Sequence, residues 1–147
     1  MAISFAAAQE ALIDVLKATP IPNVFEGVVP PGFVLPQQNG AHLPYVCVSF
    51  GGKTPVALRN QGIDSSKNHL KRTAVTVECI GDSPSDVRKV AEIVRGALEG
   101  YEVDESWSEL TELLAGDYTM YAPDYDLWPI RYATGIHYTA FVGAVTA

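Results

Sequence analysis

The sequence predicts an α+β (α/β) fold in which two main helices pack on a sheet of four to five strands. Three observations support this class. Residues 4–17 have helical periodicity, residues 71–80 alternate like a strand and lead into a capped helix at 84–98, and residues 130–142 alternate again. A length of 147 residues fits one compact domain, 1–147.

The central unit is the strand and helix between residues 71 and 98. Val75, Val77 and Cys79 recur at every second position and therefore share one face of a strand. Ser83 has the side chain of a helix N-cap, and Pro84 at the first helical position already has a helical φ. The apolar residues that follow form one helical stripe: Val87, Val90, Ala91, Val94, Ala97 and Leu98.

The N-terminal half supplies the first helix and two strands. Its helix ends before Pro20, since proline cannot continue the hydrogen-bond ladder. Residues 24–29 indicate a short strand, residues 30–40 a turn-rich connection, and residues 44–50 a strand that is apolar on both faces and hence interior to the sheet. The apolar stripe of the first helix is Phe5, Ala8, Leu12, Val15 and Leu16.

A long polar loop, residues 51–70, separates two central strands. Connections of this length are generally functional or mobile, so we expect a projecting basic arm or extended hairpin. A solvated disordered loop is the alternative reading. Half of the chain's ten Lys and Arg residues fall here or directly after it: Lys53, Arg59, Lys67, Lys71 and Arg72.

Residues 102–128 form an acidic and aromatic insertion. From Glu99 to Asp126 the chain contains nine Asp and Glu residues and neither Lys nor Arg. The helix-like spacing of Trp107, Leu110, Leu113 and Leu114 predicts a short helix over 106–115. Tyr118, Tyr121, Tyr125 and Trp128 are amphipathic aromatics, which are enriched in protein interfaces and also serve to cover the open side of a sheet.

Composition excludes several function classes. A net charge of −7 disfavours adhesion to nucleic-acid phosphates. No run approaches the roughly 18 to 20 apolar residues that span a bilayer. Residues 1–16 lack the basic start of a secretory signal, which predicts a protein made in the cytoplasm.

Candidate chemical sites are few, and no cofactor or metal site is predicted. Cys47 and Cys79 read as small buried thiols, and they could form a disulfide only if their strands are neighbours. The histidines at 42, 69 and 137 are too scattered for a metal motif. The turn at 81–83 could bind an anion, but its aspartate would repel phosphate, so helix capping explains it better.

Several ordered short patterns together resemble a known family. They are Val24–Pro30 (VFEGVVP), Leu43–Val46 (LPYV), Val75–Glu78 (VTVE), Gly81-Asp82 and Ala97–Tyr101 (ALEGY). In this order, and after an N-terminal helix, they resemble the tail terminator, or tail-completion, proteins of long-tailed bacteriophages. The similarity spans most of the chain, although the insertion at 104–128 exceeds the shorter connection of that family.

The resemblance implies helices packed on a mixed, mainly antiparallel sheet, and a non-enzymatic subunit without catalytic residues. Six copies would close a ring on the tail tube, stop polymerisation of the tube protein and join the head connector. DNA would pass through this ring without specific binding. The location would be the virion, at the head-tail junction, after assembly in the host cytoplasm.

A ring needs two unlike patches that meet between copies. We expect the basic arm and the acidic insertion to supply two such patches on opposite flanks of the subunit, where they would meet between neighbouring copies or between the ring and the tube. The alternatives are a head-tail connector adaptor and a small enzyme using carboxylates, for which the chain offers no convergent set of acid, base and nucleophile. The candidate interface residues are Lys53, Arg59, Lys67, Lys71, Arg72, Glu105, Glu109, Glu112, Tyr118, Tyr121, Tyr125 and Trp128.

Overall fold

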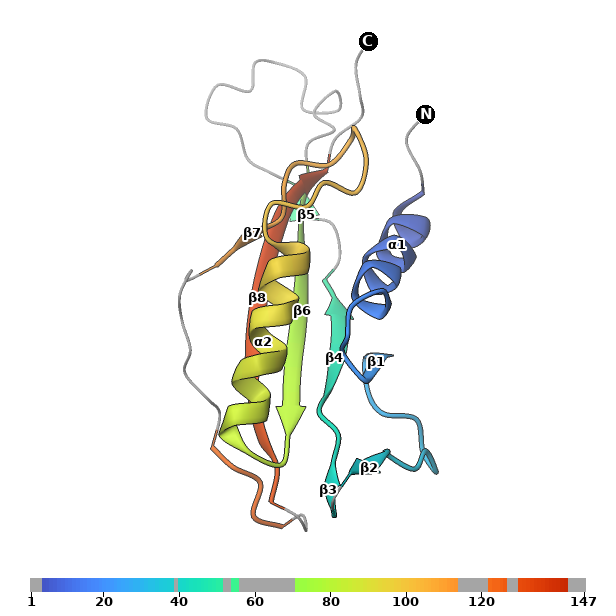
Figure 1. The fold of residues 1–147 in the computed structure, drawn as a ribbon. Coiled ribbons are helices and arrows are strands. Elements are labelled where there is room, and N and C mark those ends of the chain that lie inside the picture. The colour runs from blue at the N-terminus through green and yellow to red at the C-terminus, as the bar shows by residue number, and fades with distance from the viewer. Residues whose placement is uncertain are drawn as a thin grey trace, which may run out of the picture.

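The computed structural model describes residues 4–38, 40–51, 54–55, 71–113, 122–126 and 130–142. Two helices lie in one layer on one face of the main sheet (Figure 1). The elements are α1 (Phe5–Lys17), β1 (Asn23–Glu26), β2 (Gln37–Gln38), β3 (Ala41–His42), β4 (Tyr45–Phe50), β5 (Thr54–Pro55), β6 (Lys71–Gly81), α2 (Pro84–Leu98), β7 (Thr111–Glu112) and β8 (Tyr132–Val142).

The main sheet has the strand order β1-β4-β6-β8-β7, with β5 beside β6. Only the β1–β4 pair is parallel among the described pairings of this sheet. The expected α+β class with a mixed, mainly antiparallel sheet is therefore confirmed, and the two-residue strands β5 and β7 bring the count to six. A separate hairpin joins β2 to β3.

The longest pairing, β6 with β8, runs in register from Lys71 opposite Val142 to Gly81 opposite Tyr132. Every second residue of both strands faces the helices. Together with the helical stripes they form the core, which includes Leu12, Leu16, Val46, Val48, Val75, Val77, Val94, Leu98, Ile136 and Tyr138.

Local signals explain both helix starts. The Ser4 side chain accepts a hydrogen bond from the Ala7 N–H at 3.1 Å, and Ser83 accepts one from the Asp86 N–H at 3.2 Å. Each bond satisfies a backbone donor that the first turn leaves unpaired. The expected capping role of Ser83 is confirmed. After α2, Gly100 adopts a φ of 76°, a left-handed conformation that glycine accepts without strain.

Two expected elements differ in the structure. The strand expected at 24–29 ends at Glu26, because Gly27 has a φ of 77° and turns the chain away from the sheet. The helix expected over 106–115 is wrong. Trp107 forms a bridge with Val142, and β7 pairs with β8, so this segment returns along the edge of the sheet. Pairing with a distant strand overrides the helix-like spacing of Trp107 and Leu110, both of which are buried.

Candidate functional site

The two cysteines are free and buried on neighbouring strands. Cys79 lies opposite Val46, while Cys47 lies opposite Glu78, so the two thiols point to opposite faces of the sheet. Burial raises the pKa of Cys79 to about 12 and also raises that of Cys47. Since the thiolate is the reactive form, both residues are packing groups, as the sequence predicted.

A buried polar cluster surrounds Asp82 in the turn between β6 and α2. The Asp82 carboxylate accepts a hydrogen bond from the His42 N–H at 2.7 Å. It also lies 3.3 Å from His42 Nδ1 and 3.7 Å from Arg131 Nε, and Arg131 Nη1 donates to the Tyr45 hydroxyl at 2.9 Å. We call these four residues the Asp82 cluster. It joins the β2–β3 hairpin to the ends of β4, β6 and β8.

The Asp82 cluster contains the residue types of an acid–base site, but its side chains are engaged with one another. The other ring nitrogen of His42, Nε2, lies 3.1 Å from Gln37 Nε2. Burial raises the pKa of Tyr45, and its hydroxyl is already engaged with Arg131. The Asp82 carboxylate contacts His42 in the β2–β3 hairpin and Arg131 just before β8. The cluster therefore fixes the position of the hairpin against the main sheet.

A second buried ion pair joins α2 to the edge strand β7. Arg95 Nε donates to both carboxylate oxygens of Glu112 at 3.2 Å, and Arg95 Nη2 lies 2.9 Å from Glu112 Oε1. The side chains are 14% and 6% exposed. Glu112, a candidate interface residue, is thus engaged within the subunit and contributes little charge to its surface.

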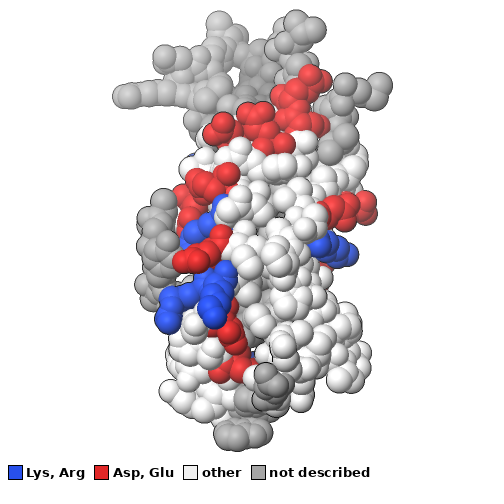
Figure 2. Space-filling view, viewed as in Figure 1, with Lys and Arg blue, Asp and Glu red and all other residues white. Residues whose placement is uncertain are grey.

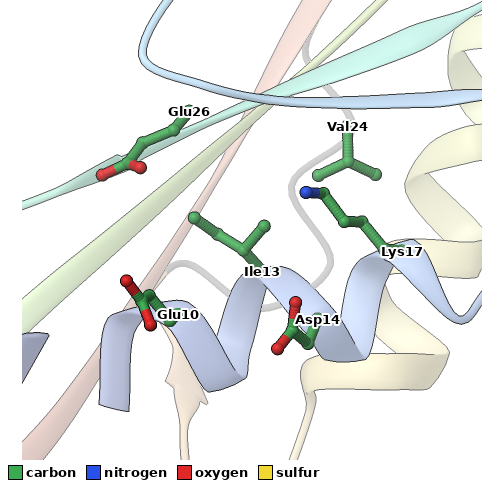
Figure 3. A pocket seen from close by; sticks show the side chains of 6 residues that line it. All are labelled: Glu10, Ile13, Asp14, Lys17, Val24 and Glu26. Carbon is green, nitrogen blue, oxygen red and sulfur yellow. The ribbon is translucent and has the colours of Figure 1, made fainter. Parts of the chain in front are cut away.

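A shallow pocket of about 280 Å³ opens between α1 and β1. Figure 3 shows Ile13 at its centre, with Glu10 and Asp14 on the helix below and Glu26 on the strand opposite. Lys17 and Val24 complete the lining. The pocket therefore carries three carboxylates against one ammonium. No group of three or more His, Cys, Asp or Glu residues that could hold a metal ion occurs in the described part of the chain.

The candidate charged residues that the structure describes share one end of the sheet. Lys71 pairs with Val142 at the end of β8, and Trp107, between Glu105 and Glu109, forms a bridge with the same valine. Figure 2 shows Asp and Glu side chains gathered at this upper end. The expectation that the basic and acidic patches lie on opposite flanks is wrong for these residues. The remaining candidates Lys53, Arg59, Lys67, Tyr118, Tyr121 and Trp128 lie outside the described residues.

The fold has a solved counterpart. A chain described as "Virion of native gene transfer agent (GTA) particle" superposes with a TM-score of 0.56, covering 96% of this chain and 100% of that chain at 20% sequence identity. No family model matches the sequence, and no curated protein matches it either. At this level of identity the likeness shows the fold.

Sequence reasoning missed the features that depend on distant contacts. The Asp82 cluster joins residues up to 86 positions apart, and no local pattern marks them as neighbours. Residues 27–29 were expected in a strand and residues 30–36 in a turn-rich connection, yet together they form a loop that presents Val28 and Val34 at 73% and 84% exposure. One signal was readable: residues 27–38 contain no charged side chain. Within the described helices, none is long and apolar enough to cross a membrane.

Proposed function

We propose that this protein is a structural subunit of a phage-like virion, a tail terminator that closes as a ring on the tail tube and joins it to the head connector. The observation that carries the proposal is the fold likeness to a chain from a gene transfer agent virion. That likeness extends over nearly all of both chains. The ordered sequence patterns from Val24 to Tyr101, which resemble those of tail terminator proteins, support the finer role.

The chemistry of the described residues fits a structural role. The buried carboxylates of Asp82 and Glu112 are paired with arginines that hold strands together. The buried thiols have raised pKa values, so little of the reactive thiolate forms near neutral pH. A net charge of −7 suits a channel wall that lets DNA pass without retaining it.

The end of the sheet that carries Lys71 and Arg72 would face a tail component. Exposed Glu102, Glu105 and Glu109 lie on the segment beside it, so both signs of charge are available at one end of the subunit. Exposed ion pairs contribute only about 0 to 1 kcal/mol each. These charges would therefore align the subunit with the tail component and add little to the affinity. Replacing Lys53, Arg59 and Lys67 with Glu should weaken binding to the tube protein, more so at low salt because screening is then weakest.

Native mass spectrometry and electron microscopy of the purified protein test the ring. Closed rings, expected to be hexamers, support the proposal, and tail tube protein added to them should stop elongating. A head-tail connector adaptor is the second candidate, favoured by the same fold likeness to a virion chain. It would form rings that bind a connector protein and leave tube elongation unchanged. A solitary protein with no effect on tube protein, or one that turns over a substrate, would overturn the proposal.

A further inference from the structure

β1 is the last strand on one side of the main sheet, and within the described part of the chain it pairs only with β4. The Gly27 N–H donates to the Val48 carbonyl at 2.7 Å. In a parallel ladder every second residue directs its backbone groups to the partner strand, so Phe25 also faces β4. The N–H and C=O of Val24 and the N–H of Glu26 then point away from the sheet. Groups of this kind pair readily with another extended chain.

The pocket between α1 and β1 lies along this outer edge, on the helix side of the sheet (Figure 3). Val24 lies opposite the core residue Val46, so Val24 and Glu26, which both line the pocket, point toward the helix layer. Ile13 of α1 is 8% exposed and supplies an apolar wall. A strand added beside β1 would direct every second side chain into this space. The volume of about 280 Å³ is below the roughly 300 to 1,000 Å³ of small-molecule pockets and suits one long side chain.

The charges of the pocket favour a cationic side chain. Its three carboxylates, on Glu10, Asp14 and Glu26, are exposed and stand against the single ammonium of Lys17. None of these four residues forms an ion pair within the described part of the chain. An incoming Lys or Arg would meet more negative charge than Lys17 neutralises, whereas an incoming Asp or Glu would be repelled.

The other face of the same edge is apolar. Phe25 points to the open face of the sheet, and the Phe33 ring lies 5.0 Å from the Phe25 ring, centroid to centroid. Val28, Phe33 and Val34, all in the 27–36 loop that follows β1, are exposed. Side chains of an added strand that point away from the pocket would lie beside these groups. An occupant that suits both faces therefore alternates a cation with apolar residues.

We propose that the outer edge of β1 binds an extended segment of another protein in which a Lys or Arg stands between two apolar residues. The backbone of the segment bonds to Val24 and Glu26, its cation enters the pocket, and its apolar side chains lie beside Phe33. A second copy suits the edge less well, because the described short strands β2, β3, β5 and β7 carry neither Lys nor Arg. The inference does not depend on the proposed ring.

A fluorescein-labelled peptide of the sequence Ser-Thr-Val-Lys-Val-Thr-Ser tests the site by fluorescence anisotropy. Saturable binding to the purified protein is expected, and a peptide with Glu in place of Lys should bind at least about fivefold more weakly. Two further peptides carry N-methyl groups at alternate positions, each blocking one edge of the peptide backbone. Only one of the two should lose binding, because only one edge faces β1. No saturable binding, or equal effects of the two methylation patterns, would overturn the proposal.

Variants of the protein locate the binding. Glu26→Pro removes a backbone donor of the outer edge together with a carboxylate, and Glu26→Thr removes the carboxylate alone, so Glu26→Pro should lose more affinity. The double variant Glu10→Lys with Asp14→Lys reverses the charge of the pocket and should prefer the Glu peptide. Its control, Glu92→Lys with Glu99→Lys, changes the net charge equally at exposed positions of α2 and its C-cap that do not line the pocket. Circular dichroism verifies that each variant is folded.

The outcomes separate the alternatives. If both double variants prefer the Glu peptide, binding follows net charge and the role of the pocket is wrong. If native mass spectrometry shows that the peptide dissociates assemblies of the unaltered protein, a second copy occupies the edge and the foreign partner is wrong. A protein that stays solitary and still binds the Lys peptide would overturn the proposed ring and leave this inference standing.

Discussion

The two faces of the main sheet differ although they are built from the same strands. On β6, Thr73, Val75, Val77 and Cys79 are 0–1% exposed beneath the helices. Arg72, just before them, and Glu78, between the last two, are exposed on the other face. The covered face is branched and apolar, so its burial stabilises the fold. The open face is too polar to require a second helical layer.

The centre of the open face is also poor in large apolar side chains. Its central positions are small or polar, among them Cys47, Ala74, Thr76 and Gly135. Thr76 Oγ1 and His137 Nδ1 lie 3.1 Å apart across β6 and β8. A face of this kind tolerates water. The comparison teaches that the apolar residues of the covered face specify the fold, while the open face contributes little to the core.

The largest effect is expected at the ion pair that ties the edge of the covered face to α2. Arg95→Ala leaves the Glu112 carboxylate buried without its guanidinium, which should destabilise the fold by about 3 to 5 kcal/mol in urea denaturation. Arg88→Ala, on the same helix but exposed, should cost less than about 0.5 kcal/mol. Replacing both partners, Arg95→Met with Glu112→Leu, should recover most of the loss. Equal costs for Arg95→Ala and Arg88→Ala would mean that the pair contributes nothing.

Adjacent residues of β8 test the two faces directly. Ile136 is 1% exposed in the core, so Ile136→Ala should cost about 2 to 5 kcal/mol through lost burial and the cavity left behind. His137 is exposed on the open face, and His137→Ala should change stability by no more than about 0.5 kcal/mol. Thermal and urea denaturation measure both variants. Similar losses at 136 and 137 would show that a partner or another layer covers the open face.

Alkaline pH should lower the free energy of unfolding through two groups that are buried on the covered face. The buried Cys79 thiol has its pKa raised from 9.0 to about 12, and burial also raises the pKa of Tyr138. The unfolded chain releases these protons first, so stability is fully present below pH 9 and falls as pH rises toward 12. The slope for one such group is about 1.4 kcal/mol per pH unit. Urea midpoints at pH 8 and pH 10.5 measure the fall, which Cys79→Ala should reduce. A variant with an unchanged slope would assign the effect to other groups.

The smallest expected change in stability concerns the N-cap of α2, which packs on the covered face. Ser83→Ala removes the acceptor of the Asp86 N–H and should cost about 1 kcal/mol in the free energy of unfolding. Ser83→Asp keeps an acceptor and should be nearly neutral. Urea denaturation of both variants decides the matter, and a Ser83→Asp loss as large as that of Ser83→Ala would exclude a capping role.

Local patterns predicted the covered face well because each is complete within a few residues. The alternation of Val75 and Val77, and the Ser83-Pro84 helix start, depend on nothing remote. The acidic segment could not be predicted in this way. Trp107 and Leu110 have helical spacing, but the partner that decides their conformation is the edge of β8, which is more than thirty residues away.

The candidate site was less predictable than the fold for the same reason. The sequence shows where positive and negative residues lie along the chain. Their positions in space depend on which strand ends meet in the fold. Lys71 and Trp107 both reach Val142, so the two charged segments meet at one end. The sequence places Arg88 and Lys89 only on the solvated side of an amphipathic helix.

The Asp82 cluster also bears on the order of folding. Its hydrogen bonds link residues 40 and 86 positions apart, so closing them orders long stretches of chain at once. Contacts with such separations carry a large loop-closure entropy and form after local ones. We therefore expect the β2–β3 hairpin to gain protection from hydrogen exchange last during refolding, once β4, β6 and β8 have brought Tyr45, Asp82 and Arg131 together. A newly made chain would then fix the position of this hairpin only after its core is complete.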